Sequence, residues 1–194
     1  MSETSRDKPK YTEIRRNRRN TKNGLKSRKN EINSGKTEIN REEKIVIKVL
    51  FICHGNICRS PMAESILTYL VNERNLQNEF IIASAATSRE EIGNGVHYGT
   101  VEKLNEVGIP VIPHRARQIT KDDYEKYDYL IGMDDANVRN IKRIVGPDDE
   151  HKIYKMLEFA GETRDVADPW YTGNFEASFR DIMRGCRAFL DWVS

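Results

Sequence analysis

The sequence predicts an α/β fold, a three-layer sandwich in which a four-stranded parallel sheet carries helices on both faces. Two observations predict this fold. A near-continuous apolar run from Ile45 to Ile52 is typical of a strand that is buried on both faces, as the strands of parallel sheets are. Strand and helix patterns then alternate along the chain, and right-handed crossovers place the helices on both faces of such a sheet.

The elements are expected in the order β-α-β-α-β-α-β-α. After the first strand and a loop, Ser60 is expected to cap a helix that has Pro61 in its first turn and apolar residues at helical spacing as far as Val71. Further apolar runs and helical stripes predict the other elements, and Gly108 ends one helix. The other expected strands span 80–86, 127–133 and, as the weakest, 152–157, and the other expected helices span 101–107, 135–144 and 175–193.

Residues 1–44 differ from the rest of the chain in composition. They hold 14 Lys and Arg against 7 Asp and Glu, a net charge of +7, and only a few scattered apolar groups. Such a segment buries too little apolar surface to offset its ordering entropy, so we predict a disordered basic tail, followed by one domain over 45–194. Two alternatives stay open: the arginines at 15–19 touch nucleic acid or another anionic surface, or the segment is a gene-model extension.

Composition also excludes several classes of protein. The chain has neither an apolar run long enough to cross a membrane nor a secretory signal pattern, so we expect a cytoplasmic protein with no membrane insertion. Three cysteines, Cys53, Cys58 and Cys186, are too few for a disulfide framework, and Cys186 lies in the apolar stripe of the last helix. No paired metal-ligand spacing occurs, and no aromatic residues interleave the basic tail. We therefore expect no metal, no cofactor and no specific nucleic-acid partner.

The loop after the first strand is the expected functional site, because ligands of open α/β sheets bind beyond the carboxyl ends of the strands. Backbone N–H groups at the helix start and the guanidinium of Arg59 favour the thiolate of Cys53. Gly55 and Asn56 tolerate backbone conformations in which successive N–H groups form an anion-binding nest. A thiolate beneath a bound phosphate is placed for in-line attack on phosphorus. The loop has the sequence Cys53-His54-Gly55-Asn56-Ile57-Cys58-Arg59-Ser60.

The stretch from Val49 to Glu64, VLFICHGNICRSPMAE, resembles the signature loop of the low-molecular-weight protein-tyrosine phosphatases. The resemblance covers about residues 45–194, with further similarity at 84–88, 114–120, 133–135 and 168–171 and in the last helix. It implies metal-independent hydrolysis of phosphotyrosine in protein substrates and of small aryl phosphates. It further implies that Cys53 forms a phosphocysteine, that Arg59 binds the phosphate and that Asp168 is the general acid and then the base.

The same resemblance implies roles for residues around these three. Ser60 is expected to donate a hydrogen bond to the sulfur of Cys53, and Asp134 to orient Arg59. Asp168, before a proline, is expected in a rigid, non-helical loop, and Cys58 is expected to form a reversible disulfide with Cys53. For Ser84 and His114, ordinary polar packing stays an open alternative. The expected phosphate-binding and loop-supporting residues are His54, Gly55, Asn56, Ile57, Cys58, Ser60, Ser84, His114 and Asp134, and Trp170 and Tyr171 are the expected aromatic wall.

Two positions and two rival functions qualify this reading. Glu90 falls where many eukaryotic members of the family carry a tryptophan that faces the substrate, so the peptide preference does not carry over. Ile57 resembles the tyrosine-directed branch, because a threonine there would resemble the phosphoarginine-specific branch. The rivals are a thiol-dependent arsenate reductase, which needs further cysteines in a mobile segment, and a non-catalytic anion-binding module. Retention of Cys53, Arg59 and Asp168 together argues against the second.

Overall fold

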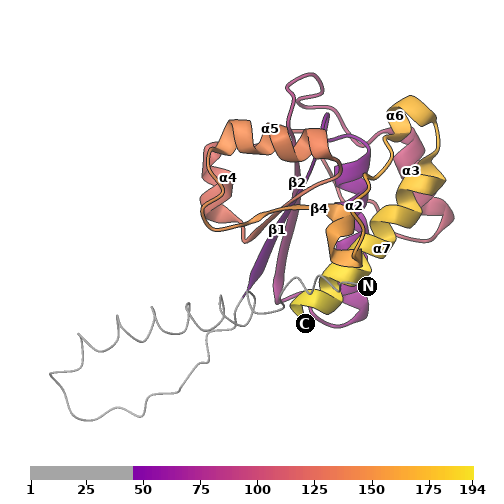
Figure 1. The fold of residues 1–194 in the computed structure, drawn as a ribbon. Coiled ribbons are helices and arrows are strands. Elements are labelled where there is room, and N and C mark those ends of the chain that lie inside the picture. Colours follow the sequence, from indigo (N-terminus) through magenta and orange to yellow (C-terminus); the bar gives the residue numbers. More distant parts are fainter. Residues whose placement is uncertain (1–45) are drawn as a thin grey trace, which may run out of the picture. The chain divides into compact units, whose positions relative to one another are not determined.

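The structure is a computed structural model that describes residues 46–194 (Figure 1). The predicted tail at 1–44 and Ile45 lie outside the described residues. Within 46–194 the chain forms one parallel sheet with the strand order β2-β1-β3-β4. Every paired strand runs parallel to its neighbour, so the predicted α/β sandwich is confirmed. The strands are β1 (Ile47–Cys53), β2 (Phe80–Ala86), β3 (Tyr129–Gly132) and β4 (Ile153–Lys155).

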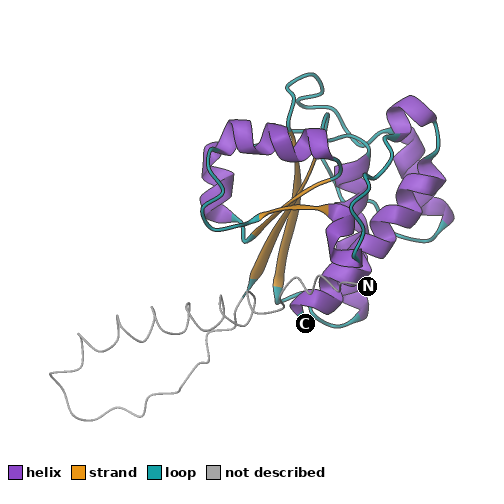
Figure 2. Ribbon diagram, in the orientation of Figure 1, coloured by secondary structure: helices purple, strands orange, loops and turns teal. Residues whose placement is uncertain are grey.

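Helices connect the strands and cover both faces of the sheet, as Figure 2 shows. The four predicted helices are present, and three short helical segments, α4, η1 and α6, were not predicted. Among residues 46–194, no helix is both long and apolar enough to span a membrane. The helices are α2 (Arg59–Glu73), α3 (Tyr98–Glu106), α4 (Lys121–Lys126), α5 (Asp135–Val145), the 3-10 helix η1 (Met156–Ala160), α6 (Pro169–Thr172) and α7 (Phe175–Val193).

The alternation of side chains along β1 builds the two core layers. Leu50 and Ile52 point to the face covered by α4 and α5, where they pack with Tyr124 and Ile141. On the other face α7 lies against the sheet, with the rings of Phe189 and Trp192 edge-on to Tyr129 of β3. The thiol of Cys186 on α7 contacts the carbonyl of Ala63 on α2, 3.8 Å away. Cys186 is fully buried, so the prediction that it is a core residue is confirmed.

Two local predictions were wrong. The helix α2 begins at Arg59, and Ser60 does not cap it, because the Ser60 hydroxyl bonds to the loop instead. The fourth strand ends at Lys155, since its partner β3 ends opposite at Gly132 and offers no further ladder. Asp168 lies in a non-helical loop with extended backbone geometry, as predicted, and it also caps the short helix α6 that follows. Proline suits the first helical position there, since its fixed φ is helical and it needs no hydrogen-bond acceptor.

Candidate active site

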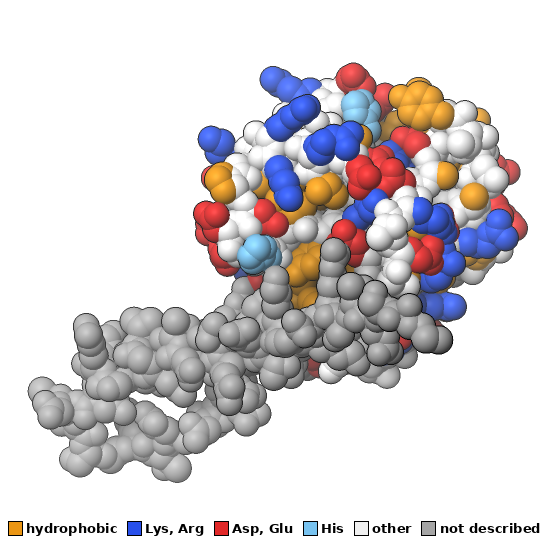
Figure 3. Space-filling model, viewed as in Figure 1, with side chains coloured by type: hydrophobic (Ala, Val, Ile, Leu, Met, Phe, Trp, Pro, Cys, Tyr) orange, Lys and Arg blue, Asp and Glu red, His pale blue; other side chains and the backbone are white. Residues whose placement is uncertain are grey.

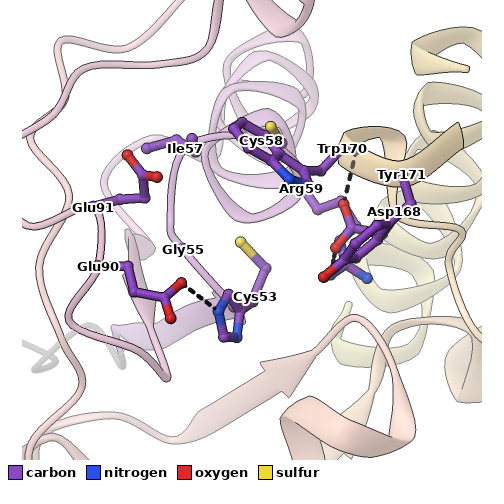
Figure 4. A pocket seen from close by; sticks show the side chains of 11 residues that line it. Cys53, Gly55, Ile57, Cys58, Arg59, Glu90, Glu91, Asp168, Trp170 and Tyr171 are labelled. Atoms are coloured by element: carbon purple, nitrogen blue, oxygen red, sulfur yellow. Dashed lines mark hydrogen bonds and ion pairs between the residues drawn. The ribbon is translucent and has the colours of Figure 1, made fainter. Parts of the chain in front are cut away.

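The loop between β1 and α2 lies at the carboxyl end of the central strand, where the sequence predicted a site. Cys53 is the last residue of β1 and pairs in register with Ala86, the last residue of β2. Backbone hydrogen bonds connect the residues after β2 to this loop. The N–H of Thr87 donates to the carbonyl of Cys53, and the N–H of Ser88 donates to the carbonyl of His54. The loop opens into a pocket of about 120 Å³ (Figure 4). Its lining residues are Cys53, His54, Gly55, Ile57, Cys58, Arg59, Glu90, Glu91, Asp168, Trp170 and Tyr171.

The sulfur of Cys53 lies at the base of this pocket, and the residue as a whole is 2% exposed. A hydrogen bond links it to the hydroxyl of Ser60, with Sγ and Oγ 3.0 Å apart. The backbone N–H of Asn56 donates to the same sulfur over 3.3 Å. The N–H of Asn56 is therefore a hydrogen-bond donor aimed at the sulfur, and the hydroxyl of Ser60, which also contacts the carbonyl of Ala85 over 3.4 Å, is its second polar neighbour.

Asn56 fixes the shape of the loop. Its φ of 60° lies in the left-handed region, which asparagine tolerates better than most residues. Its side-chain amide donates to the hydroxyls of Ser60 and Ser84, each over 2.9 Å, and its Oδ1 accepts from the backbone N–H of Arg117 over 3.1 Å. Its carbonyl accepts from Nε2 of His114 over 2.7 Å. Five polar contacts therefore meet at one fully buried residue, counting the bond from its N–H to the sulfur.

Glu64 extends this network and was not predicted as a site residue. Its Oε2 accepts a 2.6 Å hydrogen bond from the hydroxyl of Ser84 and lies 3.9 Å from Nδ1 of His114. Burial raises the pKa of Glu64, and the Ser84 bond and the charges of His114 and Arg117 oppose that rise only in part. Glu64 lies one turn after Ser60 on the same face of α2, which places it near the loop, but this spacing does not reveal its contact with Ser84.

Arg59 joins the Cys53 loop to the residue before α5 and to the loop before α6. Its Nη1 donates to Oδ2 of Asp134 over 2.7 Å and to the carbonyl of Val166 over 3.2 Å, and its Nη2 lies 2.5 Å from Oδ2 of Asp168. Burial alone would lower the pKa of Arg59, but the negative charges of Cys53, Asp168 and Asp134 outweigh it, so the pKa is raised. The guanidinium is 3% exposed and is held in one orientation beside the sulfur.

Asp168 reaches the pocket from the loop before α6. One of its oxygens, Oδ1, accepts the N–H of Trp170 over 3.1 Å, which is the capping bond of the helix, and the other oxygen faces Arg59. Trp170 and Tyr171, which follow Pro169, line the pocket on the same side and are 58% and 85% exposed. Figure 4 shows these three side chains together, across the pocket from Glu90.

The mouth of the pocket is polar on the opposite side. His54 is exposed, and its Nε2 lies 2.9 Å from Oε2 of Glu90 (Figure 4). Glu91, the next residue, also lines the pocket, and its Oε2 accepts from Nδ2 of Asn94 over 2.6 Å. A Cβ added to Gly55 would lie 3.0 Å from Cγ of Glu91, so the glycine allows that side chain to lie against the loop.

The second cysteine of the loop, Cys58, is buried and differs from Cys53 in its surroundings. Burial raises the pKa of Cys58 to about 12, with the nearby charges of Cys53 and Asp168 adding to the effect. Cys58 is therefore a protonated thiol at neutral pH. All three cysteines of the described residues are free thiols.

The structure thus brings most of the predicted site residues to one pocket and places the others behind it. Nine predicted residues line the pocket, together with Glu90 and Glu91. The five predicted supports lie one layer behind: Asn56 and Ser60 bond to the Cys53 sulfur, Asp134 bonds to Arg59, and Ser84 and His114 bond to Asn56. Within 46–194, no group of three or more His, Cys, Asp or Glu side chains is placed to hold a metal ion.

Comparisons with known proteins agree with this geometry. The family model "Low molecular weight phosphotyrosine protein phosphatase" matches residues 48–194. The low molecular weight protein-tyrosine-phosphatase YfkJ of Bacillus subtilis is 39% identical over 147 residues, which are 75% of this chain and 94% of that protein. The human low molecular weight phosphotyrosine protein phosphatase is 38% identical over 157 residues, which are 77% of this chain and 97% of that protein.

Solved structures give the same result. The crystal structure of YfkJ superposes with a TM-score of 0.72 over 75% of this chain and 93% of that one. A Drosophila arginine phosphatase, 31% identical, superposes with a TM-score of 0.69 over 75% of this chain and 96% of that one. The match of nearly the whole described region, at this identity, settles the relationship: the chain belongs to the low molecular weight phosphotyrosine protein phosphatase family.

Proposed function

We propose that this chain hydrolyses phosphotyrosine in protein substrates through a phosphocysteine on Cys53, with Arg59 binding the phosphate and Asp168 transferring the proton. One observation carries the proposal. The Cys53 sulfur, at the base of a pocket, has the backbone N–H of Asn56 and the hydroxyl of Ser60 beside it, and the Arg59 guanidinium links this group to Asp168. Nucleophile, anion-binding group and proton donor therefore share one small cavity.

In the first step, the Cys53 thiolate attacks phosphorus in line, and the S–P bond forms as the bond from phosphorus to the phenolic oxygen breaks. Asp168 gives its proton to the departing oxygen, so tyrosine leaves as a neutral phenol. Arg59 and the inward backbone N–H groups of the loop stabilise the charge on the equatorial oxygens. The exposed rings of Trp170 and Tyr171 offer a wall for the phenol ring during this step.

In the second step, Asp168 is a carboxylate and takes a proton from water, whose oxygen attacks phosphorus. The S–P bond breaks, and the electron pair returns to Cys53 as a thiolate. The hydroxyl of Ser60, 3.0 Å from Sγ, supports this thiolate as a leaving group. Inorganic phosphate is released, and the carboxyl of Asp168 is again protonated for the next cycle.

Asn56, Ser84, His114 and Asp134 serve this cycle indirectly. Asn56 holds the loop in its left-handed turn, and its bonds to Ser84 and His114 fix that turn from two sides. Asp134 holds the guanidinium of Arg59 and also caps α5 by accepting the N–H of Asn137. We assign them to positioning, since none of the four lines the pocket.

The free state of the thiols supports a reducing compartment, and we place the enzyme in the cytoplasm. The arsenate reductase alternative loses support, because Cys186 is fully buried in α7 and offers no mobile relay thiol.

Phosphoarginine is a second substrate to assay, because the Drosophila relative is an arginine phosphatase, although Ile57 favours the tyrosine-directed branch.

The test is a metal-free assay with p-nitrophenyl phosphate, a phosphotyrosine peptide and a phosphoarginine peptide. Cys53→Ser is expected to lose turnover by several orders of magnitude while still binding phosphate, because a hydroxyl is a far weaker nucleophile than a thiolate. Cys186→Ala, a change at the buried thiol away from the pocket, is the matched control and is expected to keep turnover. Undiminished activity of Cys53→Ser protein would overturn the assignment.

A further inference from the structure

The wall of the pocket opposite Asp168 carries a charge that the proposed chemistry does not use. Glu90 and Glu91 both line the mouth, and both lie in the turn that follows β2. Phosphate is an anion, so two carboxylates beside its binding site oppose its entry unless they serve another part of the substrate. We propose that these carboxylates select phosphotyrosine segments with a lysine or arginine next to the phosphotyrosine. This inference rests on the proposed function.

The turn that presents the two carboxylates is held in place from both ends. Before it, the backbone N–H of Ser88 donates to the carbonyl of His54 over 3.0 Å. After it, the N–H of Gly93 donates to the carbonyl of Ala116 over 2.8 Å. The rim is therefore fixed relative to the Cys53 loop, and charge on it acts at a constant place beside the entering substrate.

The two side chains are also held individually. Oε2 of Glu90 lies 2.9 Å from Nε2 of His54, the residue that follows the nucleophile Cys53 in sequence. Glu91 accepts from Asn94 and lies against Gly55. Carboxylates restrained in this way lose little conformational entropy when a cation binds, which favours their use in recognition.

The pocket lining is acidic, and two further arginines lie outside it: Arg89 precedes Glu90 in the turn, and Nη1 of Arg115 donates to the carbonyl of Gly93 over 3.4 Å. Among the described residues that line the pocket, Arg59 is the single lysine or arginine, and Asp134 and Asp168 already hold it. His54 faces Glu90 but is one imidazole against two carboxylates. Figure 3 shows basic side chains on the side of the view where α5 lies, a helix that carries Arg139, Lys142 and Arg143, and also on the opposite side of that view.

The occupant follows from the geometry of the proposed reaction. The phosphate must reach Cys53 and the phenol ring must pass the aromatic wall, so the neighbouring residues of a peptide substrate cross the rim. A lysine or arginine there pairs with Glu90 or Glu91, and a glutamate or aspartate is repelled. Both carboxylates are at the surface, so each is expected to raise the ratio of kcat/KM for a lysine peptide over a glutamate peptide by about fivefold at low ionic strength. This ratio is expected to shrink as salt screens the charges.

The experiment compares two phosphotyrosine peptides that are identical except for Lys or Glu beside the phosphotyrosine. The ratio of their kcat/KM values is measured for the full chain, for Glu90→Gln, for Glu91→Gln and for the double variant. Glutamine keeps the shape and hydrogen bonding of glutamate but not its charge. Glu73→Gln, at the far end of α2, is the matched control for the loss of one negative charge.

The unaltered chain and the control are expected to prefer the lysine peptide by at least about fivefold, and the double variant is expected to lose that preference. Equal kcat/KM for both peptides in the unaltered chain overturns this inference and leaves the proposed function standing. Binding of both peptides to Cys53→Ser protein, measured by fluorescence anisotropy, gives the same ratio without turnover. It therefore decides the preference even if catalysis by Cys53 is disproved.

Discussion

Arg59 and Asp168 form an ion pair at the pocket, with Nη2 of the guanidinium 2.5 Å from Oδ2 of the carboxylate. The contact joins the start of α2 to the residue that caps α6, so a single arginine sets the distance between the phosphate-binding loop and the proposed acid. Asp134 holds the other side of the same guanidinium. The position of Asp168 is thereby coupled to the loop that carries the nucleophile.

Asp168→Asn is expected to slow phenyl phosphate far more than p-nitrophenyl phosphate. Nitrophenolate leaves well without a proton, whereas the more basic phenolate needs one, so loss of the acid shows as a steeper dependence on leaving-group pKa. The measurement is kcat/KM over a series of substituted phenyl phosphates, because kcat/KM reports the first step, in which the leaving group departs, and not the hydrolysis of the phosphocysteine that all substrates share. The matched control is Asp165→Asn, in the same loop but outside the pocket lining. Equal losses across the series would remove Asp168 from this role.

The variants Asn56→Ala and Asn56→Gly separate the contribution of the Asn56 side-chain hydrogen bonds from that of its left-handed backbone conformation. Both remove its side-chain bonds and leave the backbone N–H of Arg117 without its partner, which is expected to cost about 1–3 kcal/mol of unfolding free energy. Alanine must also adopt the left-handed φ of 60°, which costs roughly 1 kcal/mol more, whereas glycine adopts it freely. Urea unfolding of both variants measures the difference. Equal stability of the two variants would show that the left-handed turn imposes no constraint.

Cys58→Ser is expected to make inactivation by peroxide harder to reverse. Peroxide oxidises the Cys53 thiolate to a sulfenic acid, and the Cys58 sulfur then attacks it, forming a disulfide and releasing water. The neutral sulfenic acid also removes the Cys53 charge, one of the causes that raise the pKa of Cys58 to about 12, so its thiolate becomes more accessible. The measurement is the activity recovered after dithiothreitol, with Cys186→Ala as control. Full recovery in Cys58→Ser, or a Cys53–Cys186 disulfide in peptide maps, contradicts this scheme.

The sequence patterns predicted the sheet and its major helices because burial leaves a long apolar pattern in both, a continuous run in a central strand and a helical stripe in a packed helix. The β1 run and the α7 stripe are of this kind. The short helices were missed because four to six residues carry too little periodicity, and α6 is set by one capping bond from Asp168. Serine is a residue type that is typical of helix caps, yet the hydrogen bond between Ser60 and Cys53 decides the position of Ser60. Local propensities do not predict that bond.

The same distinction applies to the candidate site. Residues contiguous with Cys53 were predictable from their loop, and Asp168 was assigned through the family resemblance. Glu64 was missed because its role depends on a contact with Ser84, 20 positions away, and the acidic rim depends on a turn that backbone bonds hold against the loop. Such contacts arise from the packing of distant segments rather than from a local pattern.

Deletion of residues 1–44 is expected to leave both kcat for p-nitrophenyl phosphate and the melting temperature nearly unchanged. The pocket is built entirely from residues 53–171, and the deleted segment carries a net charge of +7 with few apolar groups. With an acidic protein substrate, the full chain is expected to have the lower KM at low salt, and the difference should vanish near 0.5 M salt as charges are screened. A melting temperature lowered by several degrees on truncation would show that the segment packs on the domain.

Glu64→Gln is expected to change how stability depends on pH. Burial raises the pKa of Glu64 in the folded state above the unfolded value of 4.5, so the folded state holds this proton more tightly than the unfolded state does. Protonated Glu64 therefore favours folding fully below pH 4.5, and this contribution is lost as pH rises through the folded pKa. Glutamine stays neutral and still accepts the hydroxyl of Ser84, so the variant should gain stability relative to the original chain as pH rises. Urea unfolding from pH 4 to 8 measures both curves, with Glu73→Gln, at an exposed position of the same helix, as control. Parallel curves for Glu64→Gln and the original chain would mean that Glu64 is ionised in the folded state as readily as in the unfolded one.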